Sequence, residues 1–64
     1  MCESNVYLVD EQGNRSLFME SVDKITPNGD ELLLEDIMNK KQTIKARFVE
    51  LSLIDHKITL QRVG

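Results

Sequence analysis

The chain has 64 residues, a formal net charge of −3 and a single cysteine. A chain of this length forms at most one domain and buries only about 60% of the surface that its unfolded form exposes, so small folds of this kind often need a metal or a partner subunit. One cysteine excludes an internal disulfide, the acidic balance disfavours nucleic acid as a partner, and no apolar run approaches the roughly 20 residues that cross a bilayer. Since no secretory signal precedes the first acidic residues, we expect a cytoplasmic protein without a membrane partner.

The first part of the sequence alternates apolar and polar residues, which is the pattern of β-strands. Residues 2–9 predict a strand in which Cys2, Val6 and Leu8 share one face. Gly13-Asn14 then predicts a turn, and residues 15–21 predict the returning strand. Together these two segments predict a β-hairpin.

A second hairpin is predicted around Asn28-Gly29, the strongest two-residue turn signal in the chain. Pro27 ends or edges the strand before it, because proline has no N–H to give to a ladder. Residues 31–37 predict the returning strand, with a short helix over residues 32–39 as the alternative. We prefer the strand because the turn signal directly precedes it.

Residues 42–54 form the longest predicted strand, and its apolar residues change face near Val49. Before that point Ile44 and Phe48 share one parity, whereas Leu51 and Leu53 have the other. A β-bulge or a sharp bend near Val49 would let both halves face one core, as in a closing barrel.

Asp55-His56 predicts a tight turn, after which residues 57–63 predict the last strand. Ile58 and Leu60 are expected to point inward. The side chains expected to point outward are Lys57, Thr59 and Gln61.

Taken together, these segments predict an all-β fold, a small antiparallel β-barrel or sandwich of about six strands. We expect one domain over residues 1–64. No nucleophile motif and no phosphate-binding glycine loop is present, so the sequence does not indicate an enzyme. His56, the only histidine, is expected to be a solvated turn residue.

One basic stretch runs from Lys40 to Arg47, and it also includes Lys41 and Lys45. A basic strand with aromatic residues nearby is one way to bind RNA. We favour a solubilising outer face, because the whole chain is acidic and has few aromatic residues.

Cys2 lies beside the chain terminus, and two interpretations remain open. Free cysteines are commonly buried, and the strand pattern places Cys2 on the face of Val6 and Leu8. However, a terminal amine cannot be buried unpaired without a large cost, so the thiol lies near a solvated or ligand-bound chain end. The thiolate could then chelate a metal with the amine of Cys2 if Met1 is removed, or with the Met1 amine and the Cys2 amide nitrogen if it is kept. Such nitrogen and sulfur donors suit Ni(II) or Cu(II) in square-planar sites.

The opening "MC" followed by a short strand through Val9, the closing "DHKITL" hairpin and the all-β pattern of this length resemble the CooT family of small nickel-binding proteins. That family has also carried the label "predicted RNA-binding protein". The resemblance implies a homodimeric β-barrel-like protein that binds Ni(II) at the dimer interface through the cysteine after the initiator methionine, here Cys2. It further implies a role in nickel delivery or storage during maturation of carbon monoxide dehydrogenase.

Our first hypothesis is therefore a Ni(II)-binding accessory protein, a metallochaperone or storage protein with Cys2 and an N-terminal nitrogen, from Met1 or Cys2, as ligands. Its expected partners are a second copy of the chain and a nickel enzyme or its maturation factors. The alternative is a small RNA- or protein-binding β-barrel that uses the basic strand from Lys40 to Arg47.

Overall fold

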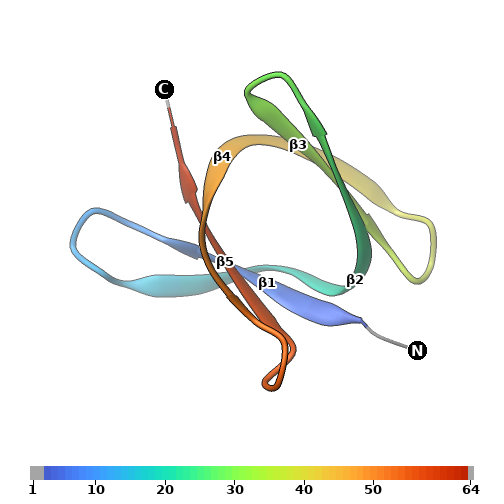
Figure 1. Ribbon diagram of the computed structural model, residues 1–64, viewed down its shortest axis with the longest axis horizontal. Coiled ribbons are helices and arrows are strands. Elements are labelled where there is room, and N and C mark those ends of the chain that lie inside the picture. Colours follow the sequence, from blue (N-terminus) through green and yellow to red (C-terminus); the bar gives the residue numbers. More distant parts are fainter. Residues whose placement is uncertain (1–2, 64) are drawn as a thin grey trace.

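The structure is a computed structural model that describes residues 3–63, and it is a closed barrel of five β-strands without helices (Figure 1). The strands are β1 (Ser4–Val9), β2 (Arg15–Asn28), β3 (Glu31–Asp36), β4 (Lys41–Ser52) and β5 (Lys57–Arg62). Consecutive strands pair antiparallel, and β1 closes the barrel by pairing with β5. The predicted all-β fold is confirmed. Residues 3–63 contain no helix long and apolar enough to cross a membrane.

The barrel differs from the prediction in two respects. The pair β1–β5 is parallel, with Val6 opposite Ile58 and Leu8 opposite Leu60. The strand count is five, because β2 runs without interruption through the point where two strands were expected to meet. There the register shifts and Ser21 has a φ of 55°, so a β-bulge bends the strand without ending it.

The loop before β2 and the turn after it both form at the glycines where the sequence predicted turns. In the β1–β2 loop, Gly13 takes a φ of 88°, which glycine adopts without steric cost. The β2–β3 hairpin forms as expected, but its two loop residues are Gly29 and Asp30, one position later than predicted, with Asn28 paired to Glu31. Gly29 has a φ of 67°, and a positive φ at the first loop position is typical of the type II′ turn.

The core consists of eight buried apolar side chains from all five strands. They are Val6, Met19, Val22, Leu32, Leu34, Ile44, Ala46 and Leu60. The returning segment Glu31–Asp36 is a strand and not a helix, with alternate residues buried. This alternation places Leu32 and Leu34 at the centre of the barrel.

The predicted β-bulge at Val49 is confirmed. Phe48 pairs with Leu60 and Glu50 with Thr59, so Val49 is the extra residue of β4. The bulge brings Leu51 opposite Ile58, on the face that points toward the core. Even so, Phe48 and Leu51 remain 41% and 55% exposed, so this half of β4 does not complete the core as expected.

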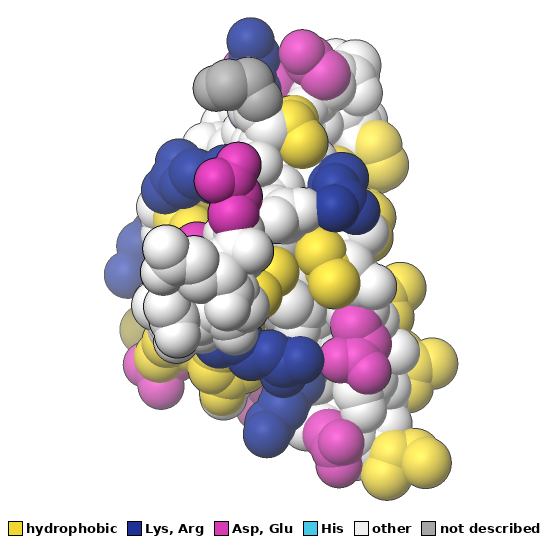
Figure 2. Space-filling model, turned by 90° about the vertical axis from the view of Figure 1, so that its left-hand side faces the viewer, with side chains coloured by type: hydrophobic (Ala, Val, Ile, Leu, Met, Phe, Trp, Pro, Cys, Tyr) yellow, Lys and Arg dark blue, Asp and Glu magenta, His cyan; other side chains and the backbone are white. Residues whose placement is uncertain are grey.

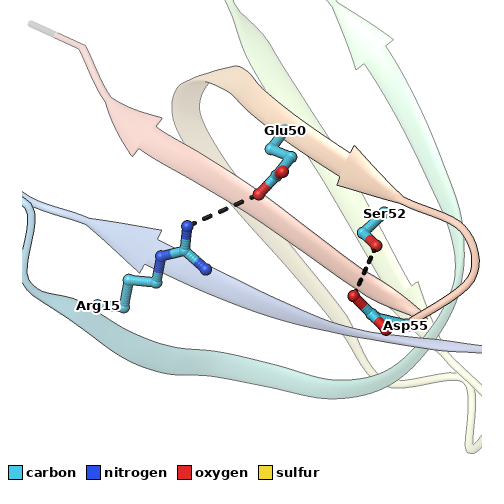
Figure 3. A network of polar contacts seen from close by, with 4 residues as sticks. All are labelled: Arg15, Glu50, Ser52 and Asp55. Carbon is cyan, nitrogen blue, oxygen red and sulfur yellow. Dashed lines mark hydrogen bonds and ion pairs between the residues drawn. The ribbon is translucent and has the colours of Figure 1, made fainter.

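Thr59 has the parity opposite to the core residue Leu60, yet it is only 2% exposed. Its neighbours in register are Tyr7 on β1 and Glu50 on β4, two larger side chains that flank a small one. Glu50 also forms an ion pair of 3.6 Å with Arg15 of β2. This pair reaches across β1 and β5 (Figure 3).

Candidate functional site

Both predicted ligand residues, Met1 and Cys2, lie outside the described residues. The nearest described segment is the start of β1, and the site is therefore built from what surrounds Ser4 and Asn5. Among residues 3–63 no group of three or more His, Cys, Asp or Glu side chains is placed to hold a metal ion.

The start of β1 is fixed on both sides by hydrogen bonds and strand pairing. On one side the backbone N–H of Asn5 donates to the carbonyl oxygen of His56 at 3.0 Å. On the other, the Asn5 side-chain oxygen accepts the N–H of Ser21 at 3.1 Å, and Ser4 pairs with Val22. The described chain therefore begins at a defined position between the β4–β5 turn and the bend of β2.

The β4–β5 turn, residues 53–56, carries two of the three most exposed large apolar side chains of the described chain. Leu53 and Ile54 are 78% and 92% exposed. Together with Val49 and Leu51 of β4, which are about half exposed, they make up what we call the β4–β5 surface. A hydrogen bond of 3.0 Å from the Ser52 hydroxyl to Asp55 ties this turn together (Figure 3).

His56 is exposed in this turn, as predicted. It has a φ of 56°, and its backbone carbonyl accepts the hydrogen bond from Asn5. The expected tight turn at Asp55-His56 is present but is four residues long.

The β3–β4 turn lies on the other flank of the start of β1, since Ser4 pairs with Val22 and Val22 pairs with Asp36. Asp36 is buried, and its carboxylate accepts the N–H groups of Met38 at 2.9 Å and Lys40 at 2.8 Å. This rigid turn presents two exposed apolar side chains, Ile37 and Met38, and Met38 is 79% exposed. The start of β1 is thus flanked by apolar turns on both sides.

The remaining loops are polar. The β1–β2 loop contains Asp10 to Asn14, and the β2–β3 turn contains Gly29 and Asp30. Figure 2 looks onto the side of the β1–β2 loop and shows charged side chains of both signs over that face, while hydrophobic side chains protrude along one edge of the molecule. Apolar side chains that gather into an exposed patch are a sign of an interaction site, whereas single scattered ones are not.

The basic side chains of this stretch are exposed, and three of the four lie opposite acidic or polar side chains. Lys41 pairs in register with Glu35, and Lys45 with Glu31. Lys45 also lies 3.8 Å from Asp30. Arg47 donates a hydrogen bond to Gln61. These contacts support the interpretation as a solubilising face and leave little unopposed positive charge for phosphates.

The sequence reasoning missed the two apolar turns. The available signal was the composition of the turns themselves, because Ile37-Met38 and Leu53-Ile54 stand where Gly, Asn, Asp, Pro and Ser are usual. We had assigned Leu53 to a strand and Ile37 to the end of another, where apolar residues are normal.

Comparison with known proteins adds the family. The family described as "CO dehydrogenase accessory protein CooT" matches residues 1–61. A crystal structure assigned to CooT from Carboxydothermus hydrogenoformans is 40% identical, with a TM-score of 0.91, covering 98% of this chain and 100% of that one. No curated protein matches the chain. The chain belongs to the CooT family, whose members are accessory proteins of carbon monoxide dehydrogenase and not enzymes.

Proposed function

We propose that this protein binds Ni(II) as a metallochaperone or storage protein during the maturation of carbon monoxide dehydrogenase. Cys2 supplies the thiolate, and the terminal amine of Met1 or Cys2 supplies nitrogen. The observation that carries the proposal is the family match, which begins at residue 1 and therefore includes Met1 and Cys2.

The donor set fits nickel. If Met1 is removed, the Cys2 amine and thiolate close a five-membered chelate ring. If Met1 is kept, the Cys2 amide nitrogen joins the Met1 amine and the thiolate in two fused five-membered rings. Ni(II) accepts such donors in square-planar geometry. If Met1 is removed, one chain supplies only two donors, and a second chain related by a twofold axis would complete four. Because the thiol must lose its proton to bind, nickel affinity should fall as the pH is lowered.

The β4–β5 surface supports a dimer in which two chain starts meet. The turn that carries Leu53 and Ile54 is hydrogen-bonded to the start of β1 through His56 and Asn5, so a copy docked on this surface would lie close to the start of β1. Leu53 and Ile54 offer apolar area to bury. The flanking charges, Asp55 and Lys57, have opposite signs, so two copies need not repel one another there. A twofold dimer is also the commonest oligomer.

The test is a Ni(II) titration of the Cys2→Ser variant by calorimetry and by the thiolate-to-nickel absorption band. We expect the band to vanish and the affinity to fall by orders of magnitude. The matched control is the double variant Cys2→Ser/Ser16→Cys, which keeps one thiol on the exposed start of β2 and should not recover binding. Tight nickel binding by Cys2→Ser would remove the proposal.

A further inference from the structure

A groove of about 380 Å³ lies between the first half of β2 and the β3–β4 turn. Residues 17–21 of β2 form one wall, and residues 36–38 with Lys40 and Gln42 form the other. We call it the seam groove. The backbone N–H of Ile37 donates to the Ser21 carbonyl at 3.0 Å, which joins the two walls at one point.

The β2 wall of this groove is an open strand edge. Residues 15–19 of β2 pair with β1 on one side, whereas β3 pairs with β2 only from Val22 onward. β2 pairs only with β1 and β3, so within residues 3–63 the other edge of this half of β2 has no strand partner. Such an edge offers free N–H and C=O groups to an added strand.

The second wall is preformed and carries two exposed apolar side chains, Ile37 and Met38. Two hydrogen bonds to the Asp36 carboxylate hold the turn, so Ile37 and Met38 stay exposed on a rigid backbone. The β1–β2 loop has the same bonds but carries Glu11 and Gln12 at the corresponding positions. The turn geometry therefore does not require apolar residues at 37 and 38. Methionine also adapts readily to different apolar partners.

We propose that the seam groove binds a short extended segment of a partner protein, with apolar side chains at alternate positions, as an added strand on β2. An extended chain can use the free backbone groups of the edge together with the apolar side chains of Ile37 and Met38. Lys40 and Glu20 give the rim one charge of each sign, and neither forms an ion pair within the described part of the chain. This balance suits a peptide carrying both charges and opposes nucleic acid. Along β1, β2 is bulged between Leu17 and Met19 and again between Met19 and Val22, which limits the added strand to a few residues.

The test uses the metal-free Cys2→Ser protein, so that its outcome is independent of the nickel proposal. The probe is a set of seven-residue peptides in which valine, leucine, isoleucine or phenylalanine alternates with threonine, with one lysine and one glutamate at the ends. Amide chemical shifts of the labelled protein are followed during titration. We expect saturable shifts at residues 16–21 and 37–40.

Two controls test the proposed binding mode. Peptides with N-methylated backbones keep their side chains but lose donors, so they should bind about tenfold more weakly or worse. The variant Ile37→Glu/Met38→Gln, which copies the β1–β2 loop, should lose binding by a similar factor while keeping its fold, whereas Leu53→Glu on the other turn should bind normally. The proposal is overturned if no peptide gives saturable shifts, if the shifts lie on β4, or if N-methylation makes no difference.

Discussion

Two five-residue loops of this barrel have the same backbone hydrogen bonds, but one exposes polar side chains and the other exposes apolar ones. In both, an aspartate accepts the N–H groups two and four residues later, Asp10 in the β1–β2 loop and Asp36 in the β3–β4 turn. In both, the fourth residue has a positive φ, 88° at Gly13 and 65° at Asn39. The loops differ in the side chains that they expose, Glu-Gln in the first and Ile-Met in the second.

Some positions of these loops determine the backbone, and others determine only which side chains are exposed. The aspartate and the residue with positive φ build the loop, because they satisfy backbone donors and permit the left-handed turn. The two residues between are free to vary. Apolar residues at these positions, and again at Leu53-Ile54, gather on the turns that flank the start of β1. That strand start closely follows the proposed nickel ligands, Met1 and Cys2, in the sequence.

The largest expected effect concerns the β4–β5 surface. Replacing Leu53 and Ile54 by glutamate should raise the dissociation constant of the proposed dimer by at least roughly 10²–10⁴-fold, because burying each side chain contributes about 1.5–3 kcal/mol and both copies carry the change. Sedimentation equilibrium measures this directly. Leu17→Glu, an exposed leucine on β2, is the matched control and should leave the dimer intact. An unchanged dimer in the double variant would place the interface elsewhere.

The next effect compares the two aspartates. Asp36→Ala should destabilise the protein by about 1–3 kcal/mol, because two backbone N–H groups lose a partly buried acceptor. Asp10→Ala removes the same two bonds from an exposed loop, where water replaces the acceptor, so its effect should be smaller. Urea denaturation of both variants gives the difference. Equal losses would show that burial of Asp36 is not what makes its turn rigid.

A smaller effect is expected at the residues with positive φ. Gly13→Ala should cost about 1–2 kcal/mol, the strain of an L-residue in the left-handed region. No atom lies within 4 Å of the added Cβ, so the cost is conformational and not steric. Asn39→Gly should be neutral or slightly stabilising in thermal denaturation, because glycine relieves the same strain. A stabilising Gly13→Ala would contradict the assigned backbone.

Local sequence signals were sufficient for much of the fold. The parity change in residues 42–54 correctly predicted the bulge at Val49, because side-chain alternation in a strand is strict. No local pattern predicted the parallel β1–β5 pair that closes the barrel, because its two strands lie at opposite ends of the sequence. The bend at Ser21 was also missed, because serine is not a residue that marks a positive φ.

The candidate site was less accessible to sequence reasoning. Cys2 could be predicted as a metal ligand from its position beside the terminal amine, because that prediction depends on donor chemistry and not on the fold. The apolar turns could not be predicted in this way, because an apolar residue in a sequence is normally assigned to the core. Only the structure shows that Met38 and Ile54 are exposed, and only strand register places both turns beside Ser4 and Asn5.

The smallest expected effect is the pH response of the polar loop. The hydrogen bond from the Asn14 backbone, aided by those from Gln12 and Gly13, lowers the pKa of Asp10 below its ordinary value of 3.8. Because the folded pKa is depressed, the stabilisation from Asp10 is present above pH 3.8 and is lost as the pH falls through the folded value. The difference in stability between the native protein and Asp10→Asn should therefore shrink in acid. A carboxyl NMR titration should find the Asp10 pKa lowered in the native protein and closer to 3.8 in Gly13→Ala, which strains the loop. An equal Asp10 pKa in both proteins would mean that the loop hydrogen bonds do not set it.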